Sequence, residues 1–134
     1  MLRILQPFNS NTGKRVVKTP KVYLRDTRTL HALLNIQSFD SLLGHPVFGA
    51  SWETMVIEQL LVNHEGDFGF YRTPAGAEID LVLEKNGKKI AIECKATTAP
   101  SVGRGFYAAL HELHIDQAFI ISPVKDKYPI KEGV

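Results

Sequence analysis

Two stretches in which apolar and polar residues alternate lie on either side of Asn86-Gly87. An Asn-Gly pair between such stretches is the strongest short-range signal for a two-residue β-hairpin turn. With this turn, Asp80 lies directly opposite Glu93, and side chains alternate between the two faces of each strand. The polar members of one face are then Glu78, Asp80, Glu93 and Lys95. The other face carries apolar side chains: Ile79, Leu81, Leu83, Ile90, Ile92 and Cys94.

The rest of the hydrophobic pattern predicts strands and helices around this hairpin. Before it, we expect strands at residues 2–8 and 14–18, an extended segment at 21–24, and a helix that Asp26 or Thr27 caps and that runs to Leu34. From the N-cap Ser51 onward, the expected elements are a helix to residue 63, a strand at 68–72, the hairpin, a helix from 102 or 104 to 113, and a strand at 117–122. This α-β-β-β-α-β order predicts an α/β fold with a mixed sheet flanked by helices.

The helix that begins at Ser51 places one carboxylate at the border of its apolar stripe. At 100° per residue the stripe contains Trp52, Met55, Val56 and Leu60. Glu53 falls inside the edge of this stripe, where an unpaired carboxylate is costly to bury. Glu58 falls on the far side and is interpreted as a solvated acid.

Composition and charge limit the classes of protein. The chain has 134 residues, 44% of them hydrophobic and 22% charged, which is typical of one globular domain. No apolar run approaches the ~20 residues that span a bilayer, so no membrane partner is expected. The lone Cys94 and the absence of a signal peptide at the N-terminus are consistent with a cytoplasmic location.

Basic residues are concentrated in the N-terminal part, although the net charge is only +2. They can form a surface for phosphate groups or for an acidic partner. Lysines on a solvated hairpin are an equally good interpretation. The candidate nucleic-acid-binding residues are Lys14, Arg15, Lys18, Arg72 and Arg104.

Opposed carboxylates on neighbouring strands destabilise a sheet unless something neutralises them. Asp80 and Glu93 are therefore candidate ligands of Mg²⁺ or Mn²⁺, with Glu53 completing the set directly or through water. Lys95 would orient a water molecule or stabilise charge on a phosphate, as metal-assisted phosphodiester hydrolysis requires. The alternative is a surface hairpin whose acids form ordinary ion pairs.

The pattern of Asp80 followed by Glu93-x-Lys95 on the next strand, within an αβββαβ order, resembles the PD-(D/E)xK nuclease superfamily, which has the restriction-endonuclease-like fold. Residues 12–26, 45–53 and 71–80 are similar to one branch of it, the C-terminal domain of unknown function 4143 of prokaryotic AAA+-type ATPases. The resemblance implies a metal-dependent nuclease with Glu53, Asp80, Glu93 and Lys95 as catalytic residues. A catalytically inactive interaction or nucleic-acid-binding module is the alternative.

In that family the domain usually follows an ATPase module and a winged-helix segment. Residues 1–20 would match the wing hairpin and residues 21–134 the nuclease-like domain. The chain contains no Gly-x-x-x-x-Gly-Lys-Ser/Thr phosphate loop, so we expect no ATP site in it and interpret it as a stand-alone remnant or a fragment. The expected partners are nucleic acid, an ATPase module in cis or in trans, and a second copy of the chain.

Overall fold

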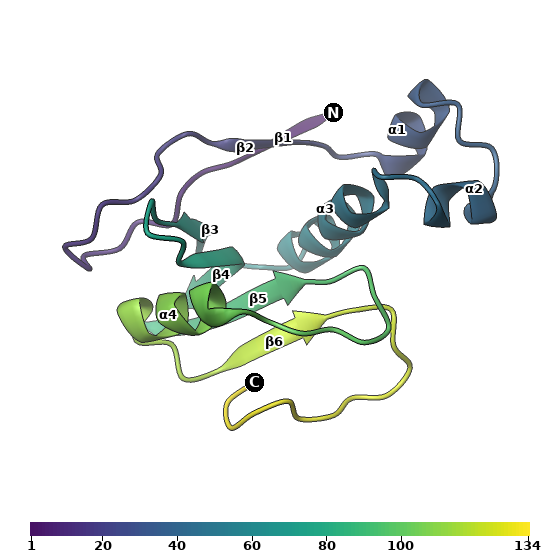
Figure 1. Cartoon of the computed structure of the whole chain (residues 1–134). Helices are drawn as coiled ribbons and strands as arrows, with labels where there is room; N and C mark the ends of the chain where they lie inside the picture. Colours follow the sequence, from purple (N-terminus) through teal and green to yellow (C-terminus); the bar gives the residue numbers. More distant parts are fainter.

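A computed structural model describes all residues, 1–134, and its centre is a four-stranded mixed sheet (Figure 1). The strands lie in the order β3-β4-β5-β6, with β5 and β6 parallel and the other neighbours antiparallel. They are β3 (Asp67–Arg72), β4 (Glu78–Lys85), β5 (Lys88–Cys94) and β6 (Ala118–Ile121). Helix α3 (Phe48–Leu61) precedes the sheet in sequence and α4 (Arg104–Leu113) connects β5 to β6. The α-β-β-β-α-β order from α3 onward is therefore confirmed.

Each face of the sheet is covered by one of these helices. On one face, Phe106, Ala109 and Leu113 of α4 pack in a cluster that includes Ile79, Val82 and Ala91. On the other face, Val56, Ile57 and Leu61 of α3 pack in a cluster with Phe70, Leu81 and Ile92. The two clusters define a mixed α/β architecture of three layers.

The hairpin forms as the sequence predicts. Asn86 and Gly87 both have positive φ, 54° and 76°, as the tight turn between β4 and β5 requires. Lys85 pairs with Lys88, and Val82 with Ala91. The predicted register is therefore confirmed as far as Leu81 and Ile92, the last pair before the acids.

A β-bulge in β4 overturns the predicted faces at the acids. Gly69 of β3 pairs with Val82 and Tyr71 pairs with Ile79, so three steps along β4 oppose two steps along β3. Ile79 consequently lies in the α4-side cluster, although Leu81 lies in the α3-side cluster. Asp80 therefore does not share a face with Val82, and Ile79 does not share one with Leu81.

The N-terminal residues form a two-stranded ribbon whose pairing differs from the prediction. Strand β1 (Leu2–Leu5) pairs antiparallel with β2 (Lys21–Leu24), so the predicted strand at 14–18 is wrong (Figure 1). In that segment the Val17 N–H donates instead to the carbonyl of Arg72, 2.8 Å away at the end of β3. The ribbon packs over α3, where Leu5 is fully buried.

Of the remaining helices, α1 forms as expected, whereas α2 was not expected and α3 begins earlier than predicted. Helix α1 (Thr27–Leu33) starts at the expected cap, because the Asp26 side chain accepts from the N–H of Arg28. The short α2 (Phe39–Leu43), capped by Ser38, was not expected. Helix α3 starts at Phe48 rather than after Ser51, and Met55 is 41% exposed, so it does not belong to the buried stripe.

Candidate functional site

Asp80 is the buried acid at the centre of the candidate site. Its residue is 8% exposed, and its Oδ2 accepts the backbone N–H of Cys94 at 2.8 Å. The backbone pairing of β4 with β5 ends at Leu81 and Ile92, and beyond that pair this side-chain hydrogen bond connects the two strands. Burial raises the pKa of Asp80, and the negative charges of Glu53 and Glu78 raise it further. The Cys94 N–H and Lys21 only partly offset these effects.

Glu53 reaches Asp80 from the helix that covers this face. The Tyr23 hydroxyl donates to Glu53 Oε1 at 2.6 Å, and the Lys21 ammonium donates to the same atom at 3.4 Å. The Lys21 Nζ also lies 3.8 Å from Asp80 Oδ1. The structure therefore brings Glu53 and Asp80 together around one ammonium group.

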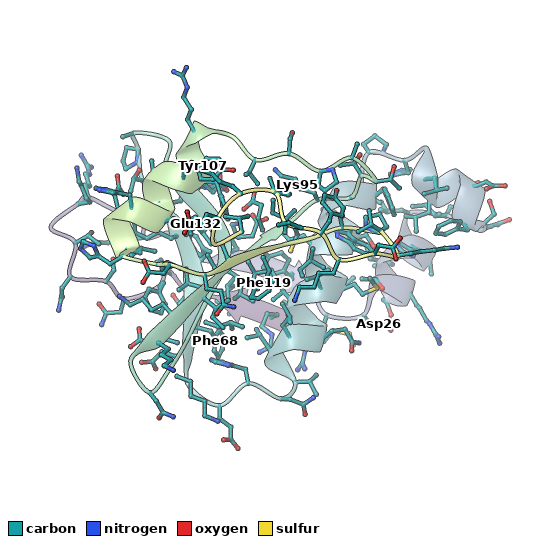
Figure 2. All side chains as sticks on the ribbon, turned by 90° about the horizontal axis from the view of Figure 1, so that it is seen from below. Asp26, Phe68, Lys95, Tyr107, Phe119 and Glu132 are labelled. Atoms are coloured by element: carbon teal, nitrogen blue, oxygen red, sulfur yellow. The ribbon has the colours of Figure 1, made fainter.

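Glu93 and Lys95 form the second part of the site, at the end of β5. The Lys95 Nζ lies 3.1 Å from Glu93 Oε1, whereas Glu93 Oε2 is buried without a hydrogen-bond partner. Burial, followed by the charge of Asp80, raises the pKa of Glu93 to about 7, although Lys95 opposes the shift. Figure 2 shows Lys95 well away from Phe68, which lies at the start of β3 and so at the other end of the sheet.

The bulge places Asp80 and Glu93 on opposite faces of the sheet, whereas the sequence predicted one shared face. Cys94 packs with the α3-side cluster, on the same side as Asp80 and Glu53. Glu93 precedes Cys94 and therefore points to the opposite side of its strand. The predicted single face of Glu78, Asp80, Glu93 and Lys95 is thus wrong. The alternation predicted that the Cys94 side chain points away from Asp80. In the structure both side chains lie on the α3 side of the sheet.

Whether this arrangement fits a divalent cation depends on its donors. No three His, Cys, Asp or Glu side chains are arranged as a ready metal centre. Mg²⁺, however, needs only one or two protein carboxylates and keeps several waters. Asp80 and Glu53 supply such a pair around a cationic group, and Glu93 Oε2 is buried without a hydrogen-bond partner. The donor set fits a hard cation held by two carboxylates.

Glu58 differs from its interpretation as a solvated acid. Its side chain is 13% exposed and forms ion pairs with Arg3 at 2.6 Å and Arg25 at 2.9 Å. The hydrogen bond from Arg3 is the largest effect on the pKa of Glu58, which is lowered. Glu58 therefore joins the ribbon to α3 rather than facing solvent.

The predicted nucleic-acid-binding residues are mostly at the surface. Lys14, Arg15, Lys18 and Arg104 are exposed, and Arg104 is the first residue of α4. Arg72 differs, because its Nε lies 3.2 Å from Glu78 Oε1 and the charges of Asp80 and Glu53 contribute to raising its pKa. Of these five residues, Arg72 is the one whose guanidinium interacts electrostatically with the acids of the candidate site.

Lys21 and Tyr23 are site residues that the sequence reasoning missed. Both lie on β2 and point inward, whereas Val22 between them is 61% exposed. Burial, followed by the hydrogen bond to Glu53, raises the pKa of the Tyr23 hydroxyl, so Tyr23 acts as a donor. The alternation of Lys21 and Tyr23 with apolar residues predicts that the two side chains share one face of a strand. The expected face for polar side chains is the solvent side, but in the structure Lys21 and Tyr23 face inward.

The geometry defines a mixed α/β domain with a buried cluster of acids at the point where two central strands separate. A family model described as "Domain of unknown function (DUF4143)" matches residues 48–134. The chain therefore belongs to this family.

Two mycobacterial relatives match the chain over its whole length. They are the uncharacterized proteins Mb2031c of Mycobacterium bovis and Rv2008c of Mycobacterium tuberculosis, each 37% identical over 135 residues. The alignment covers 100% of this chain but 31% of each relative, so the chain spans about a third of their length. No solved structure matches the chain. None of its helices has the length and apolar character needed to cross a membrane.

Proposed function

We propose that this chain is a metal-dependent, nuclease-like domain that hydrolyses phosphodiester bonds of DNA. The observation that carries the proposal is Asp80, a buried carboxylate whose pKa is raised by its burial and by Glu53 of α3. The αβββαβ order, with Asp80 on β4 and Glu93 and Lys95 at the end of β5, supports a restriction-endonuclease-like core. Buried acids with raised pKa values in one cluster are typical of catalytic sites.

Each residue then has a role that its surroundings support. Asp80 and Glu53 would hold Mg²⁺ or Mn²⁺ on the α3 side of the sheet, and Glu93 would add negative charge near Asp80 from the end of β5. When bound, such an ion polarises the phosphoryl oxygen and makes a coordinated water more acidic. Lys95, held beside Glu93, would orient the attacking water or stabilise the charge that develops on the phosphate. Exposed Lys14, Arg15, Lys18 and Arg104 would contact the nucleic-acid backbone.

The experiment compares cleavage by wild type, Asp80→Asn and Asp67→Asn. Single-stranded, duplex and branched DNA are incubated with each protein and Mn²⁺ or Mg²⁺, and EDTA serves as the metal-free arm. Asp67→Asn is the matched control, because Asp67 is exposed at the far end of β3. We expect metal-dependent cleavage by wild type and the control, and a loss of about 100-fold or more in Asp80→Asn, similar to the loss on removing one preorganised group that stabilises the transition state. Equal cleavage by all three proteins, or none by wild type, would refute the proposal.

A non-catalytic interaction or nucleic-acid-binding module is the second candidate. It is favoured by the ribbon, which turns Leu2, Ile4 and Val22 outward, each more than half exposed. Contiguous exposed apolar side chains are typical of interaction sites. The partner would be an ATPase module in the same or another polypeptide, or a second copy. Sedimentation of wild type and an Ile4→Ser variant distinguishes self-association, which the variant should weaken, from a monomer.

A further inference from the structure

The Lys21 ammonium occupies the space between the two carboxylates that would hold a metal. Its Nζ is 3.4 Å from Glu53 Oε1 and 3.8 Å from Asp80 Oδ1. A single positive charge thus contacts one oxygen from each acid. This arrangement resembles a cation site in which the cation is part of the chain.

Three contacts explain why the ammonium is held in this position. The ribbon pairs Lys21 with Leu5, which is fully buried under α3, so the Lys21 side chain is directed inward. Its Nζ lies 5.4 Å from the centre of the Phe70 ring, within the range of a cation–π interaction. The Tyr23 hydroxyl, two residues along the same strand, fixes the Glu53 oxygen that Lys21 contacts.

One ammonium does not balance the charge of the cluster. Glu53 and Asp80 share Lys21, Lys95 pairs with Glu93, and the nine-tenths buried Glu93 still has an oxygen without a partner. A divalent ion in place of the ammonium would bring two positive charges rather than one to Glu53 and Asp80. The Lys21 side chain has a flexible four-carbon stem and is 19% exposed, so its ammonium can leave the site without a movement of β2.

We propose that Lys21 is a positioning residue that takes the place of the divalent cation in the metal-free protein and is displaced when the cation binds. Its ammonium keeps the mutually repelling Glu53 and Asp80 close together. The metal must compete with it, so Lys21 lowers the metal affinity of the site. This inference rests on the metal site of the proposed function.

The test measures Mn²⁺ binding by titration calorimetry in wild type, Lys21→Met and Lys21→Arg. Methionine approximates the length of the lysine stem without its charge, whereas arginine keeps the charge. Lys85→Met is the matched control, because Lys85 forms an exposed ion pair with Glu65 at the turn end of the hairpin. We expect Lys21→Met to bind Mn²⁺ about tenfold or more tightly than wild type, which corresponds to about 1.4 kcal/mol. Lys21→Arg and Lys85→Met should remain close to wild type.

The possible outcomes separate this inference from the proposed function. Binding by Lys21→Met alone would support the role of Lys21 and refute a metal-dependent activity of the natural chain. Equal binding by wild type and Lys21→Met would overturn the role of Lys21 and leave the metal site intact. Absence of binding by both proteins would overturn both.

A second measurement uses wild type, in case Lys21→Met does not fold. The rate at which acetic anhydride acetylates Lys21 is followed by peptide mass analysis with and without Mn²⁺, with Lys85 as the internal reference. Displacement by the metal should raise the rate at Lys21 severalfold and leave Lys85 unchanged. An unchanged rate at Lys21 would overturn the inference.

Discussion

Replacing Glu93 by glutamine should stabilise the metal-free protein, and by an amount that grows with pH. Glu93 is 9% exposed, one of its oxygens has no hydrogen-bond partner, and Asp80 lies nearby. Burial and the charge of Asp80 therefore raise its pKa from 4.5 to about 7. Glutamine keeps the shape of the side chain and removes the charge that the site does not fully compensate.

The sign and size of the effect follow from the difference between the two states. Between about pH 4.5 and 7, folded Glu93 holds a proton that the unfolded chain has released. The folded state therefore binds more protons, and its stability falls as the pH rises through this window. A shift from 4.5 to about 7 corresponds to a penalty of about 3 kcal/mol above pH 7. The ion pair with Lys95 is already included in this shift.

Urea denaturation in EDTA, at intervals from pH 4 to pH 8, measures the free energy of unfolding of both proteins. The advantage of Glu93→Gln should be near zero at pH 4 and reach about 2–3 kcal/mol at pH 8. Glu65→Gln, at a side chain that is 85% exposed, provides the matched control and should show no such trend. A stability difference between Glu93→Gln and wild type that does not change with pH would refute the reasoning.

Two further predictions concern the attachment of the N-terminal residues. Glu58→Gln should lower the free energy of unfolding at pH 7 by about 2 kcal/mol, because it removes charged hydrogen bonds from Arg3 and Arg25. Since the pKa of Glu58 is lowered, this stabilisation is present above about pH 4.5 and is lost as the pH falls, so urea denaturation at pH 3 should show a smaller difference. Gly69→Ala should destabilise by about 1–3 kcal/mol, because a Cβ there would lie 2.5 Å from the backbone nitrogen of Phe8. Gly49→Ala, where nothing lies within 4 Å of the added atom, should be neutral or slightly stabilising, and urea denaturation of both alanine variants at pH 7 measures the difference.

The parts of the structure that depend on neighbouring residues could be predicted from the sequence. The turn at Asn86-Gly87 is determined by two residues that tolerate positive φ, and the pairing of Val82 with Ala91 follows from it. The cap of α1 by Asp26 is equally local. Glu53 was correctly expected to need a partner, since a carboxylate beside a buried stripe is rarely left alone.

The parts that depend on distant contacts could not be predicted. The bulge in β4 arises from its pairing with β3, next to Gly69, where residues 6–8 cross so closely that a side chain would not fit. It alters which face Asp80 occupies, although the residues around Asp80 alternate regularly. The inward orientation of Lys21 likewise depends on its pairing with Leu5, sixteen positions away. No pattern within β2 alone distinguishes its inner side from its outer side.

The ribbon also determines where this domain can be divided. The family model begins at residue 48, the first residue of α3, and leaves out both strands of the ribbon. A fragment cut there would contain Glu53 and Glu58 but none of the side chains that form ion pairs or hydrogen bonds with them, namely Arg3, Lys21, Tyr23 and Arg25. The smallest fragment suitable for measuring metal binding or cleavage therefore includes the residues before position 48. In a shorter fragment, Glu53 and Glu58 of α3 would lack their partners, so its metal binding would differ from that of the intact site.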